Sequence, residues 1–183
     1  KMHSTATDLA APLFKRWEGN TATNRQPVIF KGRAICMSNG RIIVLDANPS
    51  NDVDGDGNPD DGLPDAPGSS YDILWQSAPL ATPTSAPTCA EVPNSILPTL
   101  RPGFNCVNQI LVTDGNGRVL VFDLESPPGA NVAPLRTIDP PDASILGTDG
   151  PYPPTIHEGL AFVADTRSSG NSGRVWIIDL AQS

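Results

Sequence analysis

An aspartate-rich stretch, NDVDGDGNPDDG, occupies residues 51–62 and carries the side chains of this chain that are best suited to bind a metal ion. No Lys or Arg occurs between residues 42 and 100, so repulsion among these carboxylates is not relieved by a neighbouring basic residue. Such a segment needs either bulk water or a bound cation. Ca²⁺ takes about six to eight oxygen ligands, and alternating carboxylates on a loop that turns back on itself provide them.

The spacing follows the calcium loop of EF-hand proteins over its first half. Asp52, Asp54 and Asp56 hold the first, third and fifth positions, and glycine follows where the sharp turn requires it. The last position is Leu63 in place of a bidentate Glu, so Asp61 or Asp65 is expected to close the shell. The sequence therefore predicts a Ca²⁺ site that stiffens a long insertion, and a solubilising acidic turn is the alternative. The predicted ligands are Asp52, Asp54, Asp56, Asn58, Asp60 and Asp61.

The acidity of the chain is local. Of its 20 acidic residues, six lie in or beside this stretch, and the remaining fourteen nearly balance the 12 Lys and Arg. Basic residues are not clustered, which argues against a nucleic-acid partner. No apolar run approaches the roughly 18 residues that span a bilayer, so membrane insertion is not expected. The six acidic residues in or beside the aspartate-rich stretch are Asp52, Asp54, Asp56, Asp60, Asp61 and Asp65.

The positions of the cysteines indicate whether the protein is located in oxidising surroundings. Cys89 and Cys106 stand at the two ends of a Pro-rich segment, and a disulfide between them would close an 18-residue loop. Such a bridge stabilises a fold by roughly 3 kcal/mol and implies oxidising surroundings outside the cytoplasm. Two unrelated free thiols are the alternative. Cys36, inside the strand-like run RAICM, is expected to be a buried small hydrophobe.

Catalytic residues are sparse. His157 and Glu158 could form an acid–base pair, but neighbours on a strand point to opposite faces, which favours a structural role. The sequence has no nucleophile elbow, no Walker loop and no dinucleotide fingerprint. The DGNG stretch at residues 114–117 is expected to be a turn and not a second metal site. A non-enzymatic role is therefore predicted.

The elements that must position these residues are three similar β-hairpins. Each has an apolar strand, a polar Gly/Asn turn and a second apolar strand ending in Asp. We call their shared segment, Gly-Arg-(Ile/Val)-x-(Ile/Val)-x-Asp, the kernel. Strands such as RIIVL and RVWII are apolar throughout, so burial on both faces is predicted. The kernels are Gly40–Asp46, Gly117–Asp123 and Gly173–Asp179.

The kernels are 77 and then 56 residues apart, which exceeds the roughly 40–50 residues of one propeller blade. Three insertions account for the excess: the acidic loop at 49–70, the Pro-rich cysteine loop at 78–106 and a Pro-rich loop at 139–156. The prediction is therefore one all-β domain over residues 1–183. Its architecture is a partial or small β-propeller of four-stranded antiparallel blades with long loop insertions.

The stretch from residue 12 to residue 77 resembles the repeat of PQQ-like β-propellers. Trp17 and Leu74-Trp75 match its two tryptophan places, and Leu45-Asp46-Ala47 matches its hairpin end, although Asn48-Pro49 replaces the usual Thr-Gly. The third hairpin is similar to other bacterial propeller repeats, and the acidic loop resembles thrombospondin-type and dockerin-type calcium repeats. The vicinal Cys-Cys pair of quinoprotein dehydrogenases does not occur.

The predicted function is a non-catalytic, extracytoplasmic, calcium-binding propeller module that serves protein–protein interaction, adhesion or assembly. One version of such a module is the calcium-bearing PQQ-like propeller of type IV pilus tip adhesins, which the last strand, GRVWIIDL, also resembles. Two alternatives remain: a subunit of an extracellular fibre or multi-chain complex, and a fragment of a quinone-dependent dehydrogenase. The expected partners are a protein or further chains of an assembly, and a small-molecule ligand is left open.

Overall fold

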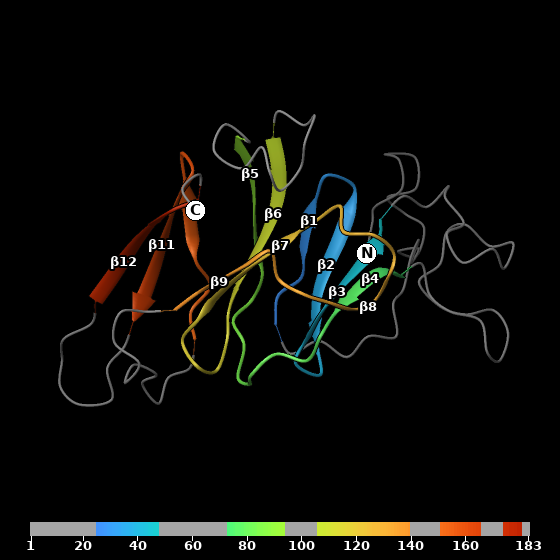
Figure 1. Ribbon diagram of the computed structural model, residues 1–183, viewed down its shortest axis with the longest axis horizontal. Coiled ribbons are helices and arrows are strands. Elements are labelled where there is room, and N and C mark those ends of the chain that lie inside the picture. The colour runs from blue at the N-terminus through green and yellow to red at the C-terminus, as the bar shows by residue number, and fades with distance from the viewer. Residues whose placement is uncertain (1–24, 48–72, 94–105, 140–150, 166–173, 181–183) are drawn as a thin grey trace, which may run out of the picture.

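The computed structural model describes residues 25–47, 73–93, 106–139, 151–165 and 174–180 (Figure 1). In these ranges the chain forms twelve strands and no helix, so the all-β prediction is confirmed. No helix long and apolar enough to cross a membrane occurs in this part of the chain. The strands form three sheets that lie side by side in Figure 1.

We number the sheets in chain order. Sheet 1 has the order β1-β2-β3-β4-β8, sheet 2 the order β5-β6-β7-β9, and sheet 3 the order β10-β11-β12. All neighbours are antiparallel except β4 and β8, which are parallel. Sheet 1 consists of β1 (Val28–Phe30), β2 (Arg33–Ser38), β3 (Arg41–Asp46), β4 (Ile73–Ser77) and β8 (Gly129–Val132). The others consist of β5 (Thr88–Pro93), β6 (Cys106–Thr113), β7 (Val119–Asp123), β9 (Arg136–Ile138), β10 (Thr155–His157), β11 (Leu160–Asp165) and β12 (Arg174–Asp179).

The three predicted hairpins are confirmed as β2–β3, β6–β7 and β11–β12. In the first, Asn39 and Gly40 have φ values of 49° and 69°, the left-handed pair that a tight hairpin turn requires. One hydrogen bond recurs in all three sheets, because the residue after each kernel Asp donates its N–H across the hairpin. These bonds are Ala47 to Gly32 (3.0 Å), Leu124 to Asn108 (2.8 Å) and Leu180 to Gly159 (2.9 Å).

Two apolar layers lie between the sheets, and the kernel residues of β7 alternate between them. A third, smaller cluster on the other face of sheet 1 contains Ala34, Cys36, Ile43 and Leu45. Ile42 and Val44 of β3 pack in the layer shared with sheet 2, where they meet Leu120 and Phe122 of β7. The intervening β7 residues, Val119 and Val121, pack toward sheet 3. In sheet 3 the residues equivalent to Leu120 and Phe122 are Trp176 and Ile178, and they pack against this second layer. Each sheet therefore meets the next through the same kernel positions.

Several finer predictions were wrong. Of the three sheets, only sheet 2 is a four-stranded antiparallel sheet, because sheet 1 gains the parallel strand β8 and the described part of sheet 3 has three strands. The kernel strand β12 is not buried on both faces, since Val175 and Ile177 are each 64% exposed. The predicted insertion at 78–106 contains β5, and that at 139–156 contains all but the last residue of β10. The acidic insertion at 49–70 lies outside the described residues.

The segment from β4 to β5 runs across two hairpin turns. Leu80 N–H donates to the Gly40 carbonyl at 2.8 Å, and Gly115 N–H donates to the Ala81 carbonyl at 2.7 Å. A Cβ at Gly115 would lie 2.3 Å from the Thr82 carbonyl oxygen, so this approach requires glycine. The turns of sheets 1 and 2 thus fix the path that leads into β5.

Candidate binding site

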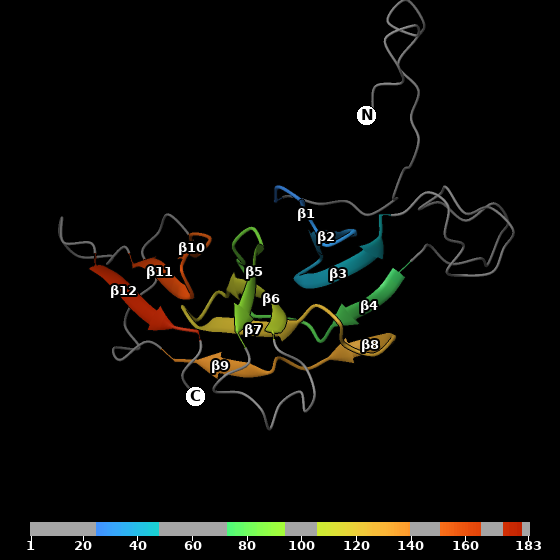
Figure 2. The same ribbon diagram turned by 90° about the horizontal axis from the view of Figure 1, so that it is seen from above.

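The first strands of the three sheets come together along one side of the molecule. β1, β5 and β10 are edge strands of their sheets, and β5 contacts both of the others. Figure 2 shows the three strands on one side, with β8 and β9 on the opposite side. A proline directly precedes each first strand, at Pro27, Pro87 and Pro154. Proline is suited to the start of an edge strand because no ladder hydrogen bond is lost there.

A cavity of about 410 Å³ lies against these strands. The Thr88 hydroxyl donates to the Pro154 carbonyl at 2.8 Å and so joins β5 to the segment before β10. Arg25 Nε donates to the Thr84 carbonyl at 2.7 Å and ties the segment before β1 to the segment before β5. The cavity is lined by Gln26, Val28, Phe30, Ala86, Pro87, Thr88, Cys89, Pro153, Pro154 and Thr155.

The described walls of this cavity are neutral. Burial raises the pKa of the Cys89 thiol to about 12, so this sulfur is protonated near neutral pH and is a poor nucleophile. The other walls are apolar or carry only amide and hydroxyl groups. Apolar contact and hydrogen bonding are therefore the chemistry of this cavity, and none of its described walls supplies an acid or a base.

A charged cluster links sheets 1 and 2 at the other end of β5. The Lys31 ammonium, on the β1–β2 turn, pairs with the Glu91 carboxylate of β5. The Lys31 hydrogen bond lowers the pKa of Glu91, and the same bond raises the pKa of Lys31. Burial, and next a hydrogen bond to Glu91, raise the pKa of the Cys106 thiol. Both charged side chains are nearly half exposed, so the cluster is a surface contact between sheets.

The predicted disulfide between Cys89 and Cys106 is wrong. The β5–β6 ladder pairs Cys89 with Ile110 and Cys106 with Pro93, so the two cysteines are four positions apart along the ladder. At about 3.3 Å per residue the offset is about 13 Å, well beyond the roughly 4.4–6.8 Å that a disulfide spans between Cα atoms. Both are free thiols. Cys36 is buried in β2, as predicted.

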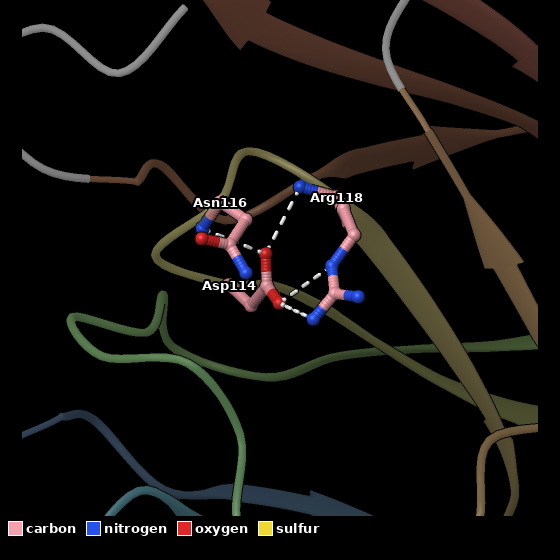
Figure 3. Close-up of polar contacts among 3 residues, drawn as sticks. All are labelled: Asp114, Asn116 and Arg118. Carbon is pink, nitrogen blue, oxygen red and sulfur yellow. Dashed lines mark hydrogen bonds and ion pairs between the residues drawn. The ribbon is translucent and has the colours of Figure 1, made fainter. Parts of the chain in front are cut away.

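The DGNG stretch is a turn, as predicted, and both of its carboxylate oxygens are used within it (Figure 3). Asp114 is fully buried, and its Oδ1 accepts the backbone N–H groups of Asn116 and Arg118 at 3.0 Å each. Its Oδ2 accepts Nε and Nη2 of Arg118 at 2.9 and 2.5 Å. The Asp114 hydrogen bond raises the pKa of Arg118. This carboxylate closes the β6–β7 hairpin.

His157 and Glu158 are exposed neighbours at the β10–β11 turn. Their side chains are 74% and 82% exposed, and Nε2 lies 3.9 Å from Oε1. The expectation that they occupy opposite faces of a strand was wrong, because Glu158 lies in the turn with a φ of 48°. They lie outside the cavity's lining.

The predicted calcium ligands Asp52, Asp54, Asp56, Asn58, Asp60 and Asp61 all lie outside the described residues. In the part of the chain that the structure does describe, no three His, Cys, Asp or Glu residues gather to hold a metal ion. The cavity residues were not predicted, although the proline before each first strand is a sequence signal that could have found them. Comparison with protein-family models and with curated proteins gives no match.

Proposed function

We propose that this chain supplies three consecutive blades of a PQQ-like β-propeller, and that it is a non-catalytic module for protein–protein interaction, adhesion or assembly. The observation that carries the proposal is the convergence of β1, β5 and β10, each the first strand of its sheet. In a propeller the first strand of every blade lines the central axis, and successive blades pack face to face. In such a propeller, the cavity against these strands would correspond to the axial site.

The repeated packing of the kernel supports the same proposal. Ile42 and Val44 pack toward sheet 2, and Val119 and Val121 pack toward sheet 3. A closed propeller needs about four to eight blades, so three require completion. The remaining blades come from further polypeptide, which makes the chain a part of a larger assembly.

The cavity's neutral chemistry favours binding over catalysis. A quinone-dependent dehydrogenase needs groups that move protons and electrons, whereas the described walls carry amide, hydroxyl, protonated thiol and apolar groups. A ligand of the cavity would be a neutral group that presents apolar surface and hydrogen-bonding atoms. The alternative of a dehydrogenase fragment is less well supported by this composition.

Calcium binding and an extracytoplasmic location belong to the proposal. The acidic loop supports Ca²⁺ through the spacing of Asp52, Asp54 and Asp56. The location rests on this loop alone, because the disulfide that first supported it is not formed. Calcium modules outside cells work at about 0.1–1 mM Ca²⁺, a concentration that weakly binding loops require.

The native mass of material isolated from its natural source under non-denaturing conditions tests this function. It should be measured by light scattering in excess Ca²⁺ and in excess EDTA, with an absorption spectrum. The proposal predicts a colourless assembly well above the 19.3 kDa of the chain. A colourless 19.3 kDa monomer that is stable in both buffers would overturn the assembly role. A quinone absorbance with reduction of a dye by an alcohol or sugar would overturn the non-catalytic role.

A further inference from the structure

An apolar groove of about 230 Å³ lies between sheets 2 and 3, beside the β6–β7 turn. One of its walls contains the cross-strand pair of Val119 in β7 and Ile138 in β9. The other wall contains the cross-strand pair of Val163 in β11 and Trp176 in β12. The described lining consists of Gly117, Val119, Ile138, Asp139, Val163, Trp176, Ile177 and Ile178.

The walls of this groove are held by the sheets themselves. Apart from Gly117 and Asp139, every described lining residue lies on a strand. Val119 and Val163 are 3% and 4% exposed, and both belong to the apolar layer between the two sheets. A cavity of about 150 Å³ admits a benzene molecule, so the groove has room for a small ligand that carries one ring. Its described walls therefore form a site for an apolar body.

Asp139 gives the groove its charge, because it is the only ionisable residue of the described lining. The residue is exposed and so lies on the solvent side of the groove. Among the described residues, none forms a hydrogen bond or a direct ion pair with its carboxylate. An uncompensated carboxylate beside apolar walls favours a positively charged ligand over a neutral or an anionic one.

The neighbouring cation, Arg118, is already paired with another carboxylate. Its Nε and Nη2 both donate to Oδ2 of the buried Asp114, at 2.9 and 2.5 Å (Figure 3). The pKa of Arg118 is raised chiefly by this hydrogen bond and least by the charge of Asp139. Because Asp114 and Arg118 neutralise each other, the negative charge of Asp139 remains available to a ligand.

We propose that this groove binds a small organic ammonium ion, with its apolar body between Val119 and Val163 and its ammonium group beside Asp139 and the Trp176 indole. An aromatic ring and a carboxylate both attract an ammonium group, and the aliphatic walls accept the rest of such a ligand. The groove is distinct from the cavity against β1, β5 and β10, since the two described linings share no residue. The inference therefore goes beyond the proposed propeller function and does not depend on it.

The test titrates the full chain, labelled with ¹⁵N and with ¹³C in its methyl groups, with benzylammonium chloride and with benzyl alcohol at constant ionic strength. The two probes share a ring and differ in charge. The proposal predicts saturable shifts of the methyl resonances of Val119, Ile138 and Val163 and of the indole resonance of Trp176. Benzylammonium should bind about fivefold more tightly than benzyl alcohol.

Asp139→Asn should abolish this preference for the cation and leave the affinity for benzyl alcohol unchanged. Glu158→Gln is the matched control, because it removes one negative charge at an exposed position outside the groove and should retain the preference.

Three results of the titrations would overturn the inference: no shifts with either probe, equal affinities of the wild type for the two probes, or the same loss of preference in both variants. Nuclear Overhauser contacts from another segment of this chain to the Val163 methyl groups in the free protein would also overturn it, because the groove would already be filled. None of these measurements depends on the native mass, which tests the proposed function separately.

Discussion

The indole Nε1 of Trp75 donates a hydrogen bond of 2.9 Å to the carbonyl oxygen of Leu124 and so fastens the fourth strand of sheet 1 to the end of β7 in sheet 2. The Trp75 ring also stacks on Phe122, with centroids 6.1 Å apart and planes inclined by 26°. Both aromatic side chains are almost completely buried. One side chain thus supplies polar and apolar contact between the two sheets.

Replacement of Trp75 should separate these two contributions. Trp75→Phe keeps an aromatic ring but leaves the Leu124 carbonyl without its donor, and the free energy of unfolding should fall by about 1–3 kcal/mol. Trp75→Ala also leaves a cavity and should cost about 3–5 kcal/mol. Chemical denaturation measures both losses. Ile29→Ala on the exposed edge is the control, with an expected change within about 0.5 kcal/mol. A Trp75→Phe variant that is as stable as the wild type would contradict the assigned hydrogen bond.

A pair of glycine variants tests the path of the segment before β5. Gly115→Ala would bring a Cβ to 2.3 Å from the Thr82 carbonyl oxygen, so the backbone must move and the loss should exceed about 2 kcal/mol. Gly32 has a φ of 73° but open space around it, so Gly32→Ala should cost only about 1 kcal/mol of backbone strain. Thermal and denaturant unfolding compare the two. A smaller loss of unfolding free energy for Gly115→Ala than for Gly32→Ala would show that the β6–β7 turn does not contact the segment before β5.

The ion pair between Lys31 and Glu91 predicts a pH-dependent stability. Because Lys31 lowers the pKa of Glu91 from its usual 4.5, the folded state gains stability above this value and loses it as the pH falls through the lowered pKa. Glu91→Gln should therefore melt below the wild type at pH 7 by a small margin, since the pair is half exposed. The two melting temperatures should converge in acid, well below pH 4.5. A difference that persists or grows in acid would contradict the ion pair as its source.

The hairpins could be predicted from the sequence because their signals are local. Turn residues such as Asn39 and Gly40 lie between apolar strands, and the kernel repeats the arrangement three times. Strand β5 was not predicted because it is short and lies in a Pro-rich segment. Pro87 directly precedes this strand, and Pro93 is its last residue. The register of β5 on β6 also depends on contacts distant in sequence, so the separation of Cys89 from Cys106 could not be read from their spacing.

The predicted Ca²⁺ site of the acidic loop can be tested directly by thermal unfolding. The spacing of the acidic loop predicts that Ca²⁺ raises the melting temperature relative to excess EDTA, and a ligand at a hundredfold of its Kd adds about 2.7 kcal/mol to the free energy of unfolding. Asp54→Ala removes one predicted ligand and should reduce this calcium-dependent rise. Asp139→Ala, outside the loop, is the control and should retain it. Identical melting in Ca²⁺ and EDTA for the wild type would remove the site.

The candidate cavity could be predicted only in part. The proline before each first strand marks Pro27, Pro87 and Pro154 as equivalent positions, and that pattern is visible in the sequence. Their convergence depends on how the sheets pack through layers such as Val119 and Val121 against sheet 3. The orientation of whole sheets follows from many long-range contacts, which a local pattern does not specify.

Light scattering of the native material tests most directly the claim that these three sheets belong to a larger propeller assembly. The account predicts a colourless assembly with a mass well above the 19.3 kDa of the chain. A colourless 19.3 kDa monomer that is stable both in excess Ca²⁺ and in excess EDTA would contradict it.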